Sequence, residues 1–156
     1  MAAKWAAAAA LAMVVFGCGQ KVATPTMNAS DGPGKGTAAT GKVEWLNDYE
    51  TALAMAREQG KPLMVDVMAD WCSICKRMEA EVYTRADVAA SAGRFVAVKV
   101  DGDRRPELKE KFDVSGYPTL VLLSADGKEL GRVRGGVPYQ LLIKALDEAA
   151  EKAGGK

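Results

Sequence analysis

The pattern of apolar and polar positions from residue 43 onward predicts a folded segment of alternating helices and strands. The first helix is indicated by four apolar residues at helical spacing and ends at Gly60: Leu46, Tyr49, Leu53 and Ala56. Two nearly continuous apolar runs, residues 63–68 and 95–100, are typical of strands that are buried on both faces. A sheet built on such strands needs helices on both of its faces.

Between these two runs, the pattern predicts two more helices. The first begins at Cys72 and carries one apolar face: Ile74, Met78 and Val82. The second is short, because Thr84 and Asp87 have the spacing of a capping box and Gly93 follows as a stop. Cys72 is therefore expected at the start of a helix, directly after a buried strand.

The rest of the folded segment predicts a helix, a hairpin and a final helix. Pro106 fits the first turn of the helix. Residues 120–123 and 129–133 flank an Asp-Gly pair, which predicts the hairpin. The final helix begins at Pro138 and has an apolar inner face: Leu142, Ala145, Leu146 and Ala149. This order predicts an α/β fold of three layers, with a central mixed sheet flanked by helices.

The composition narrows the function classes. The chain of 156 residues has 21 basic and 20 acidic residues and no histidine. Balanced charge argues against a nucleic-acid footprint, which needs a basic excess. The lack of histidine excludes a Ser-His-Asp triad, a Cys-His couple and histidine-ligated metal sites. We expect neither a metal nor another cofactor.

The N-terminal segment has the features of a secretory signal peptide over residues 1–17. Lys4 gives a positive start, and the apolar run that follows is too short to span a bilayer as a helix. The run ends in Val-Phe-Gly-Cys18, which resembles a bacterial lipobox and predicts lipidation of Cys18. An ordinary cleaved signal peptide with an incidental Cys18 is the alternative.

The residues after Cys18 predict a tethered domain. Residues 18–42 are rich in Gly, Ala, Thr, Ser and Pro and are expected to form a flexible tether, whereas residues 43–152 form the folded domain. The chain has three cysteines, and acylation of Cys18 would leave a single pair. Acyl chains would hold the domain on a membrane. By analogy with lipoproteins, Gly19 after the cysteine indicates the outer membrane, if the cell has one.

That remaining pair, Cys72 and Cys75, has the spacing of a redox site. A disulfide between them closes a loop too small to constrain the unfolded chain much, so a purely structural role is disfavoured. A structural zinc site needs four ligands, and haem attachment needs a histidine where Lys76 stands. Because backbone N–H groups and the helix dipole favour an anion at a helix start, we expect Cys72 to be the more acidic and more exposed thiol.

The residues around this pair resemble the thioredoxin superfamily. Residues 65–76, Val-Asp-Val-Met-Ala-Asp-Trp-Cys-Ser-Ile-Cys-Lys, resemble its active-site segment, and residues 116–119, Gly-Tyr-Pro-Thr, resemble its cis-proline loop. Residues 60–62 and 69–72 favour the branch that contains the C-terminal periplasmic domain of the electron-exporting protein DsbD and free-standing thioredoxin-like proteins. The resemblance covers about residues 43–150 and implies a thioredoxin-like fold.

The resemblance also implies a role for Asp66, which occupies the position of a buried carboxylate in thioredoxins. Burial would raise its pKa and let it exchange a proton with Cys75, through water, near neutral pH. Two structural alternatives remain open for Asp66. It could form an ion pair with Lys99 or another base, or it could lie at a wet strand edge.

The same resemblance implies a substrate-binding surface. Pro118 is expected to follow a cis peptide bond after Tyr117, in a loop that faces the cysteines and pairs with an extended substrate segment. Tyr117 and Trp71 are expected to shape substrate docking. Plain packing is the alternative for both aromatic residues.

Together these features predict an exported thiol–disulfide oxidoreductase, held on the periplasmic face of the cell envelope. Ser73 and Ile74 bring no charge to the pair, which favours a reductase. Protein disulfides would be its substrates, a membrane protein of DsbD type its electron donor, and the chain a monomer. The alternatives are a binding or redox-sensor module that docks to one partner, and an oxidase or isomerase of the same fold.

Overall fold

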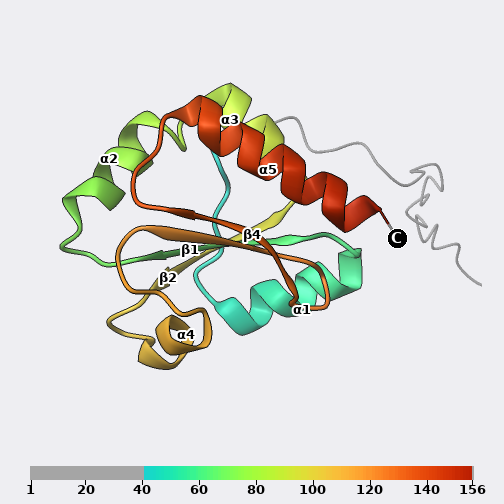
Figure 1. The fold of residues 1–156 in the computed structure, drawn as a ribbon, viewed down its shortest axis with the longest axis horizontal. Coiled ribbons are helices and arrows are strands. Elements are labelled where there is room, and N and C mark those ends of the chain that lie inside the picture. Colours follow the sequence, from blue (N-terminus) through green and yellow to red (C-terminus); the bar gives the residue numbers. More distant parts are fainter. Residues whose placement is uncertain (1–40, 156) are drawn as a thin grey trace, which may run out of the picture. The chain divides into compact units, whose positions relative to one another are not determined.

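The computed structural model describes residues 41–155 of the chain (Figure 1). The predicted signal peptide, the predicted lipidation site Cys18 and all but the last two residues of the predicted tether lie outside the described residues. Along the described part, the elements follow in the order helix, strand, helix, helix, strand, helix, strand, strand, helix. The predicted elements are all present, in the predicted order.

Four strands form one mixed sheet in the order β2-β1-β3-β4. Their bounds are Leu63–Met68 for β1, Val96–Asp101 for β2, Thr119–Leu123 for β3 and Glu129–Arg134 for β4. β1 runs parallel to β2 and antiparallel to β3, and β3 and β4 form the predicted antiparallel hairpin. Because β1 and β2 are parallel, they end at the same edge of the sheet, and the loops that follow them lie side by side.

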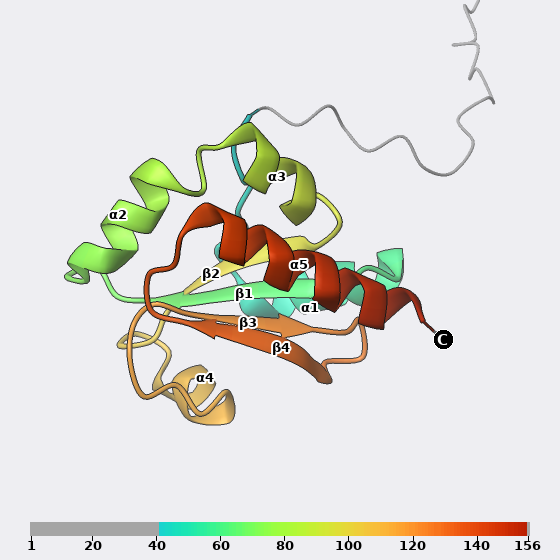
Figure 2. The same ribbon diagram turned by 45° about the horizontal axis from the view of Figure 1, so that its top comes forward.

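Helices cover both faces of this sheet (Figure 2). α1 (Tyr49–Gln59) and α4 (Pro106–Lys111) pack on one face, whereas α2 (Ser73–Glu81), α3 (Ala86–Ala92) and α5 (Tyr139–Gly154) pack on the other. This arrangement confirms the predicted three layers. Among the helices of residues 41–155, none is long and apolar enough to cross a membrane.

The central strand β1 contributes to a separate hydrophobic core on each face. Leu63, Val65 and Val67 belong to the core under α1 and α4, whereas Met64 belongs to the core under α2, α3 and α5. Leu63, Val65 and Val67 are fully buried, and burial of each such side chain stabilises the fold by about 1.5–3 kcal/mol. Strand alternation places Asp66 on the same face as Met64, the face that α2 covers.

The first helix begins later than its apolar spacing predicts. α1 begins at Tyr49, because the Asp48 side chain caps it by accepting a hydrogen bond from the Thr51 backbone N–H at 2.8 Å. Leu46 lies outside the helix and forms a parallel bridge with Val98 of β2. Assigning Leu46 to the helix was therefore wrong, because an extended segment can bury the same apolar side chain against the sheet.

The capping box predicted for the short helix α3 is also wrong. Arg85 occupies the N-cap position without a side-chain capping bond. The hydroxyl of Thr84 instead donates to the carbonyl of Ala80, and Asp87 pairs with Arg85. A threonine hydroxyl that can reach the preceding turn has no need to cap the next helix. The predicted end of α3 at Gly93 is confirmed.

Candidate active site

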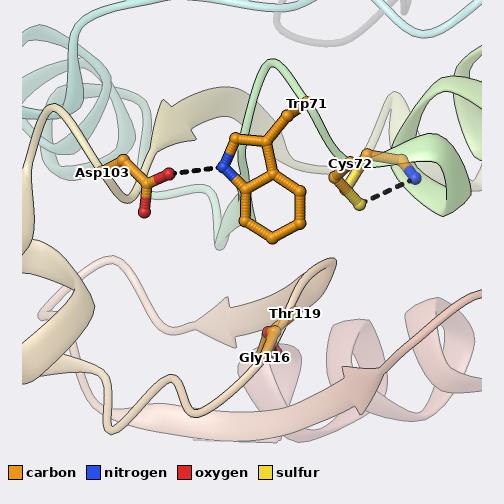
Figure 3. The surroundings of a disulfide bond; sticks show 6 residues. Trp71, Cys72, Asp103, Gly116 and Thr119 are labelled. Carbon is orange, nitrogen blue, oxygen red and sulfur yellow. Dashed lines mark hydrogen bonds between the residues drawn. A yellow bond between two sulfur atoms is a disulfide. The ribbon is translucent and has the colours of Figure 1, made fainter.

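β1 leads directly into the cysteine pair. Cys72 is the N-cap of α2, with φ −71° and ψ 107°, and it forms a disulfide with Cys75 across a Cα–Cα distance of 5.3 Å. The backbone N–H of Cys75 donates to Sγ of Cys72 at 3.1 Å (Figure 3). This sulfur takes the place of the side-chain oxygen that caps most helices. The same N–H donor and the positive end of the helix dipole would both stabilise a thiolate at Cys72 Sγ once the disulfide is reduced.

The disulfide is buried at both of its ends. Cys72 is 4% exposed and Cys75 is 6% exposed. In the disulfide form the two residues are buried alike, because they share one cluster with Ala69 against which Met68 and Tyr117 pack. The greater exposure expected for the Cys72 thiol concerns the reduced pair and stays a prediction. Burial of the pair limits attack on the disulfide to groups that approach from the rim.

Ile74, between the two cysteines, does not lie on the buried face of α2 as predicted. Its side chain is 39% exposed, whereas Met78 is 5% exposed. A Cβ atom added to Gly136 would lie 2.7 Å from the Ile74 side chain, so the loop after β4 passes close to the start of α2. Ile74 is therefore an apolar residue at the rim of the disulfide.

The loop before β3 lies next to the cysteines, as predicted. The peptide bond between Tyr117 and Pro118 is cis, which confirms the prediction. The hydroxyl of Thr119 donates to the carbonyl of Gly116 at 2.8 Å and closes the loop. Tyr117 packs against the buried cluster that contains Cys72 and Cys75.

Asp66 is a buried carboxyl group with an incomplete set of partners. It is 3% exposed, and its Oδ1 atom has no hydrogen-bond partner. Burial raises the pKa of Asp66 from 3.8 to about 6, against the opposing effects of the Lys99 charge and a hydrogen bond with Tyr83. The alternative that Asp66 lies at a solvent-exposed strand edge is therefore wrong, and the predicted burial of Asp66 is confirmed.

The Lys99 side chain lies between the aromatic ring of Trp45 and the carboxylate of Glu79, on the face of the sheet that α2 covers. Its ammonium forms an ion pair with Glu79 of α2 and lies 4.9 Å from the centre of the Trp45 ring. Lys99 thus acts on Asp66 as a nearby charge, while its ion pair is with Glu79. Within residues 41–155, no group of three or more cysteine, aspartate or glutamate side chains is placed to hold a metal ion.

Trp71, Tyr117 and Asp103 form a cluster at the rim, which we call the aromatic clamp. The Trp71 indole N–H donates to Asp103 Oδ2 at 2.7 Å, and the Tyr117 hydroxyl donates to Asp103 Oδ1 at 2.7 Å. The two rings meet edge to face, with their centres 5.8 Å apart. Figure 3 shows the indole of Trp71 between Asp103 and Cys72. These two hydrogen bonds lower the pKa of the Asp103 carboxyl.

Sequence reasoning missed two residues that the structure brings to this site, Asp103 and Tyr83. A signal for Asp103 exists: it follows β2, the parallel neighbour of the strand that leads to Cys72. Because such strands end at one edge of the sheet, a polar residue after β2 is expected near a site that follows β1. No comparable signal points to Tyr83, which contacts Asp66 only through the packing of the segment after α2.

Comparisons with known proteins agree with this geometry. The thioredoxin-like domain family matches residues 49–150, so the chain belongs to this family, and it has the fold and paired cysteines of a thiol–disulfide oxidoreductase. Over 102 residues the chain is 32% identical to thioredoxin-like protein HCF164 of Arabidopsis thaliana, across 65% of this chain and 38% of the relative. It is 33% identical to the thiol:disulfide interchange protein DsbD of Pseudoalteromonas atlantica, across 59% of this chain and 16% of the relative.

The solved structures agree on the fold. A thioredoxin from Thermus thermophilus superposes with a TM-score of 0.66 at 30% identity, over 72% of this chain and 91% of that chain. The described domain therefore corresponds to nearly a whole thioredoxin. It spans well under half of the curated relatives HCF164 and DsbD.

Proposed function

We propose that the chain is an exported thiol–disulfide oxidoreductase that reduces disulfides in client proteins. The observation that carries this proposal is the Cys72–Cys75 disulfide at the start of α2, with a backbone N–H directed at Cys72 Sγ. The cis-proline loop beside the pair and the buried Asp66 support it. A thiolate stabilised at a helix start is the nucleophile that disulfide exchange requires.

In the reaction that we infer, the Cys72 thiolate attacks one sulfur of a client disulfide. This step forms a mixed disulfide and releases the first client thiolate. The Cys75 thiolate then attacks Cys72 Sγ, which restores the Cys72–Cys75 disulfide and releases the second client thiolate. Two electrons pass from the dithiol of the enzyme to the client, and two protons end on the client thiols.

Asp66 is the group that we assign to proton transfer with Cys75. A nucleophilic Cys75 must first lose its proton, and a carboxylate with a pKa of about 6 can accept a proton near neutral pH. The unpartnered Oδ1 atom supports this role, because it leaves one oxygen free for a water molecule.

Client binding is assigned to the rim of the disulfide. The backbone before Pro118 would pair with an extended client segment, as an added strand does. Trp71 is 71% exposed in the loop that leads to Cys72, and Tyr117 lies in the cis-proline loop and packs against the cysteines. A large exposed aromatic side chain next to a reactive pair supports a docking role.

The activity is tested by insulin reduction in the presence of dithiothreitol. The wild-type chain should accelerate the precipitation of the insulin B chain, and Cys72→Ser should follow the uncatalysed curve. Cys75→Ser, once reduced and freed of dithiothreitol, should instead accumulate a mixed disulfide with the client, because no second thiol is present to resolve it. Coincident curves for the wild type and Cys72→Ser would favour the binding or sensor module over the enzyme.

The direction of electron flow is tested by the reduction potential of the pair. Ser73 and Ile74 place no cation near Cys72, and a less stabilised thiolate makes a weaker oxidant. We expect a reduction potential near that of thioredoxin, about −270 mV. A potential near that of DsbA, about −120 mV, would contradict the reductase and identify the chain as an oxidase. An envelope reductase also needs a donor, for which we propose a membrane protein of DsbD type.

For the location, we propose a signal peptide over residues 1–17, a lipid anchor on Cys18 and a tether over residues 18–42. This arrangement would hold a monomeric domain at the periplasmic face of the envelope, on the outer membrane if the cell has one. Radiolabelled palmitate should enter the wild-type chain and should not enter Cys18→Ser. Label that persists in Cys18→Ser would exclude this lipidation site.

A further inference from the structure

The Asp103 carboxylate divides its two oxygens between two aromatic side chains from different loops. Oδ2 accepts from the Trp71 indole and Oδ1 accepts from the Tyr117 hydroxyl, each at 2.7 Å. Trp71 comes from the loop after β1, Asp103 from the loop after β2, and Tyr117 from the cis-proline loop. The aromatic clamp thus joins all three loops at the rim of the disulfide.

Trp71 needs such an anchor, because packing alone does not fix it. Its side chain is 71% exposed, and a ring that is so exposed has few neighbours to restrict its rotamers. The bond to Asp103 and the edge-to-face contact with Tyr117 hold it beside Cys72 (Figure 3). A held aromatic surface binds a partner with less loss of side-chain entropy than a mobile one.

The position of Asp103 is itself fixed by its neighbours. Asp101 Oδ1 accepts from the Asp103 backbone N–H at 2.9 Å, and the Gly102 N–H donates to the Met68 carbonyl at 2.8 Å. A Cβ atom on Gly102 would lie 2.6 Å from the Tyr117 hydroxyl oxygen. Glycine at position 102 therefore leaves the space in which Tyr117 reaches Asp103.

We propose that Asp103 is a positioning residue for client docking, and this inference rests on the proposed function. By holding Trp71 and Tyr117 in one orientation, Asp103 presets an apolar surface for a side chain next to the reactive cysteine of an extended client. Asp103 makes no bond to either sulfur atom in the structure of residues 41–155. Its loss is therefore expected to weaken client binding and to leave the thiol chemistry intact.

The test compares Asp103→Ala with Asp70→Asn in the full chain. Asp70 is an exposed carboxylate that precedes Trp71 and pairs with Arg104, so its variant removes the same charge from the same rim without touching the clamp. With insulin as client, Asp103→Ala loses both bonds of the clamp and should raise KM two- to tenfold, the range expected when the Trp71 side chain must be ordered on binding, with kcat nearly unchanged. The small disulfide 5,5′-dithiobis(2-nitrobenzoate) needs no docking surface. The rate at which Asp103→Ala reduces it should stay within twofold of the wild-type rate.

A second readout follows the Trp71 indole directly. The ¹⁵N relaxation of its indole N–H, assigned with Trp71→Phe, should report greater mobility in Asp103→Ala and no change in Asp70→Asn. Tyr117→Phe, which keeps the ring and removes one bond of the clamp, should give a smaller increase in KM. An indole of unchanged mobility, or equal losses with insulin and with the small disulfide, would overturn the proposal.

The two proposals fail in different ways. If the wild-type chain reduces no disulfide, the proposed function fails, and the relaxation measurement still decides whether Asp103 holds Trp71. If the wild type is active and Asp103→Ala behaves like Asp70→Asn with insulin, the docking role fails alone.

Discussion

Asp66 and Asp103 are two aspartates of one site with opposite surroundings. Asp66 lies within β1, 3% exposed, with one oxygen unpartnered, and its pKa is raised to about 6. Asp103 lies in an exposed loop with a donor on each oxygen, and its pKa is lowered. Desolvation thus favours the protonated form of Asp66, whereas the two hydrogen bonds favour the charged form of Asp103.

This difference separates two tasks that the same side chain can perform. A carboxyl group that is suited to proton transfer needs a pKa near the working pH, and burial without full hydrogen bonding supplies it. A carboxylate that anchors other side chains must keep its charge, and hydrogen-bond donors at its oxygens favour the charged form by lowering its pKa. Four changes test this contrast, from the largest expected effect to the smallest.

Replacing Asp66 by asparagine should remove a pH-dependent cost to stability. The raised pKa means that the folded chain binds this proton more tightly than the unfolded chain. The cost is absent below the unfolded pKa of 3.8 and is complete above pH 6, where it amounts to roughly 2–3 kcal/mol. Urea unfolding of the oxidised protein should therefore give Asp66→Asn a gain over the wild type that grows from pH 4 to pH 8. A gain that does not change with pH would contradict the buried titration.

Tyr83→Phe should disturb the same group from its other side. The hydrogen bond with Tyr83 lowers the pKa of Asp66, so its removal should raise that pKa above about 6. Leaving the buried carboxylate with fewer donors should also cost about 2 kcal/mol of stability. A side-chain carboxyl titration by NMR measures the pKa. Tyr49→Phe is the control, because Tyr49 is also buried and bonded to Lys111 but lies in the opposite core.

Gly102→Ala should disrupt the hydrogen bond between Tyr117 and the exposed Asp103. The added methyl group would lie 2.6 Å from the Tyr117 hydroxyl oxygen and displace it from Asp103. Crowding of this kind should cost about 1 kcal/mol, measured by thermal or urea unfolding. Gly131→Ala adds the same methyl group where no atom lies within 4 Å and should leave the Tyr117 ring signals unchanged. Equal effects of the two variants would argue against the close approach.

The smallest expected effect is a pH dependence of opposite sign at Asp103. Its lowered pKa means that the charged form stabilises the fold above the unfolded pKa of 3.8 and that this contribution fades as the pH falls through the folded pKa. Asp103→Asn should therefore lose a little stability at pH 7, and the deficit should shrink as the pH approaches 3. A deficit that grows on acidification would exclude the bonds to Trp71 and Tyr117 as its cause.

The sequence predicted most of the fold, because its strong signals are local. The apolar run of β1, the Asp-Gly turn of the hairpin and Pro106 at the start of α4 each depend on neighbouring residues, and each matches the structure. The errors arose where two local structures satisfy one pattern. Leu46 fits both a helix face and an extended segment, and the hydroxyl of Thr84 can turn either forward or back.

The residues of the site also differ in whether local sequence predicts them. Cys72, Cys75 and the cis bond before Pro118 follow from short motifs, and the burial of Asp66 follows from its place in an apolar run. The clamp does not, because Trp71 and Asp103 are 32 residues apart and meet only through the parallel pairing of β1 and β2. Shared acceptors of this kind depend on how loops are placed, which periodicity does not encode.

The sulfur of Cys72 also serves as the N-cap of α2, which affects how mutants of this residue must be interpreted. Alanine at position 72 would remove both the nucleophile and the acceptor for the Cys75 N–H, at a cost of about 1 kcal/mol at the start of the helix. Loss of activity in that variant would mix missing chemistry with local fraying. Serine keeps an acceptor at the same place, so only the serine variant separates the two.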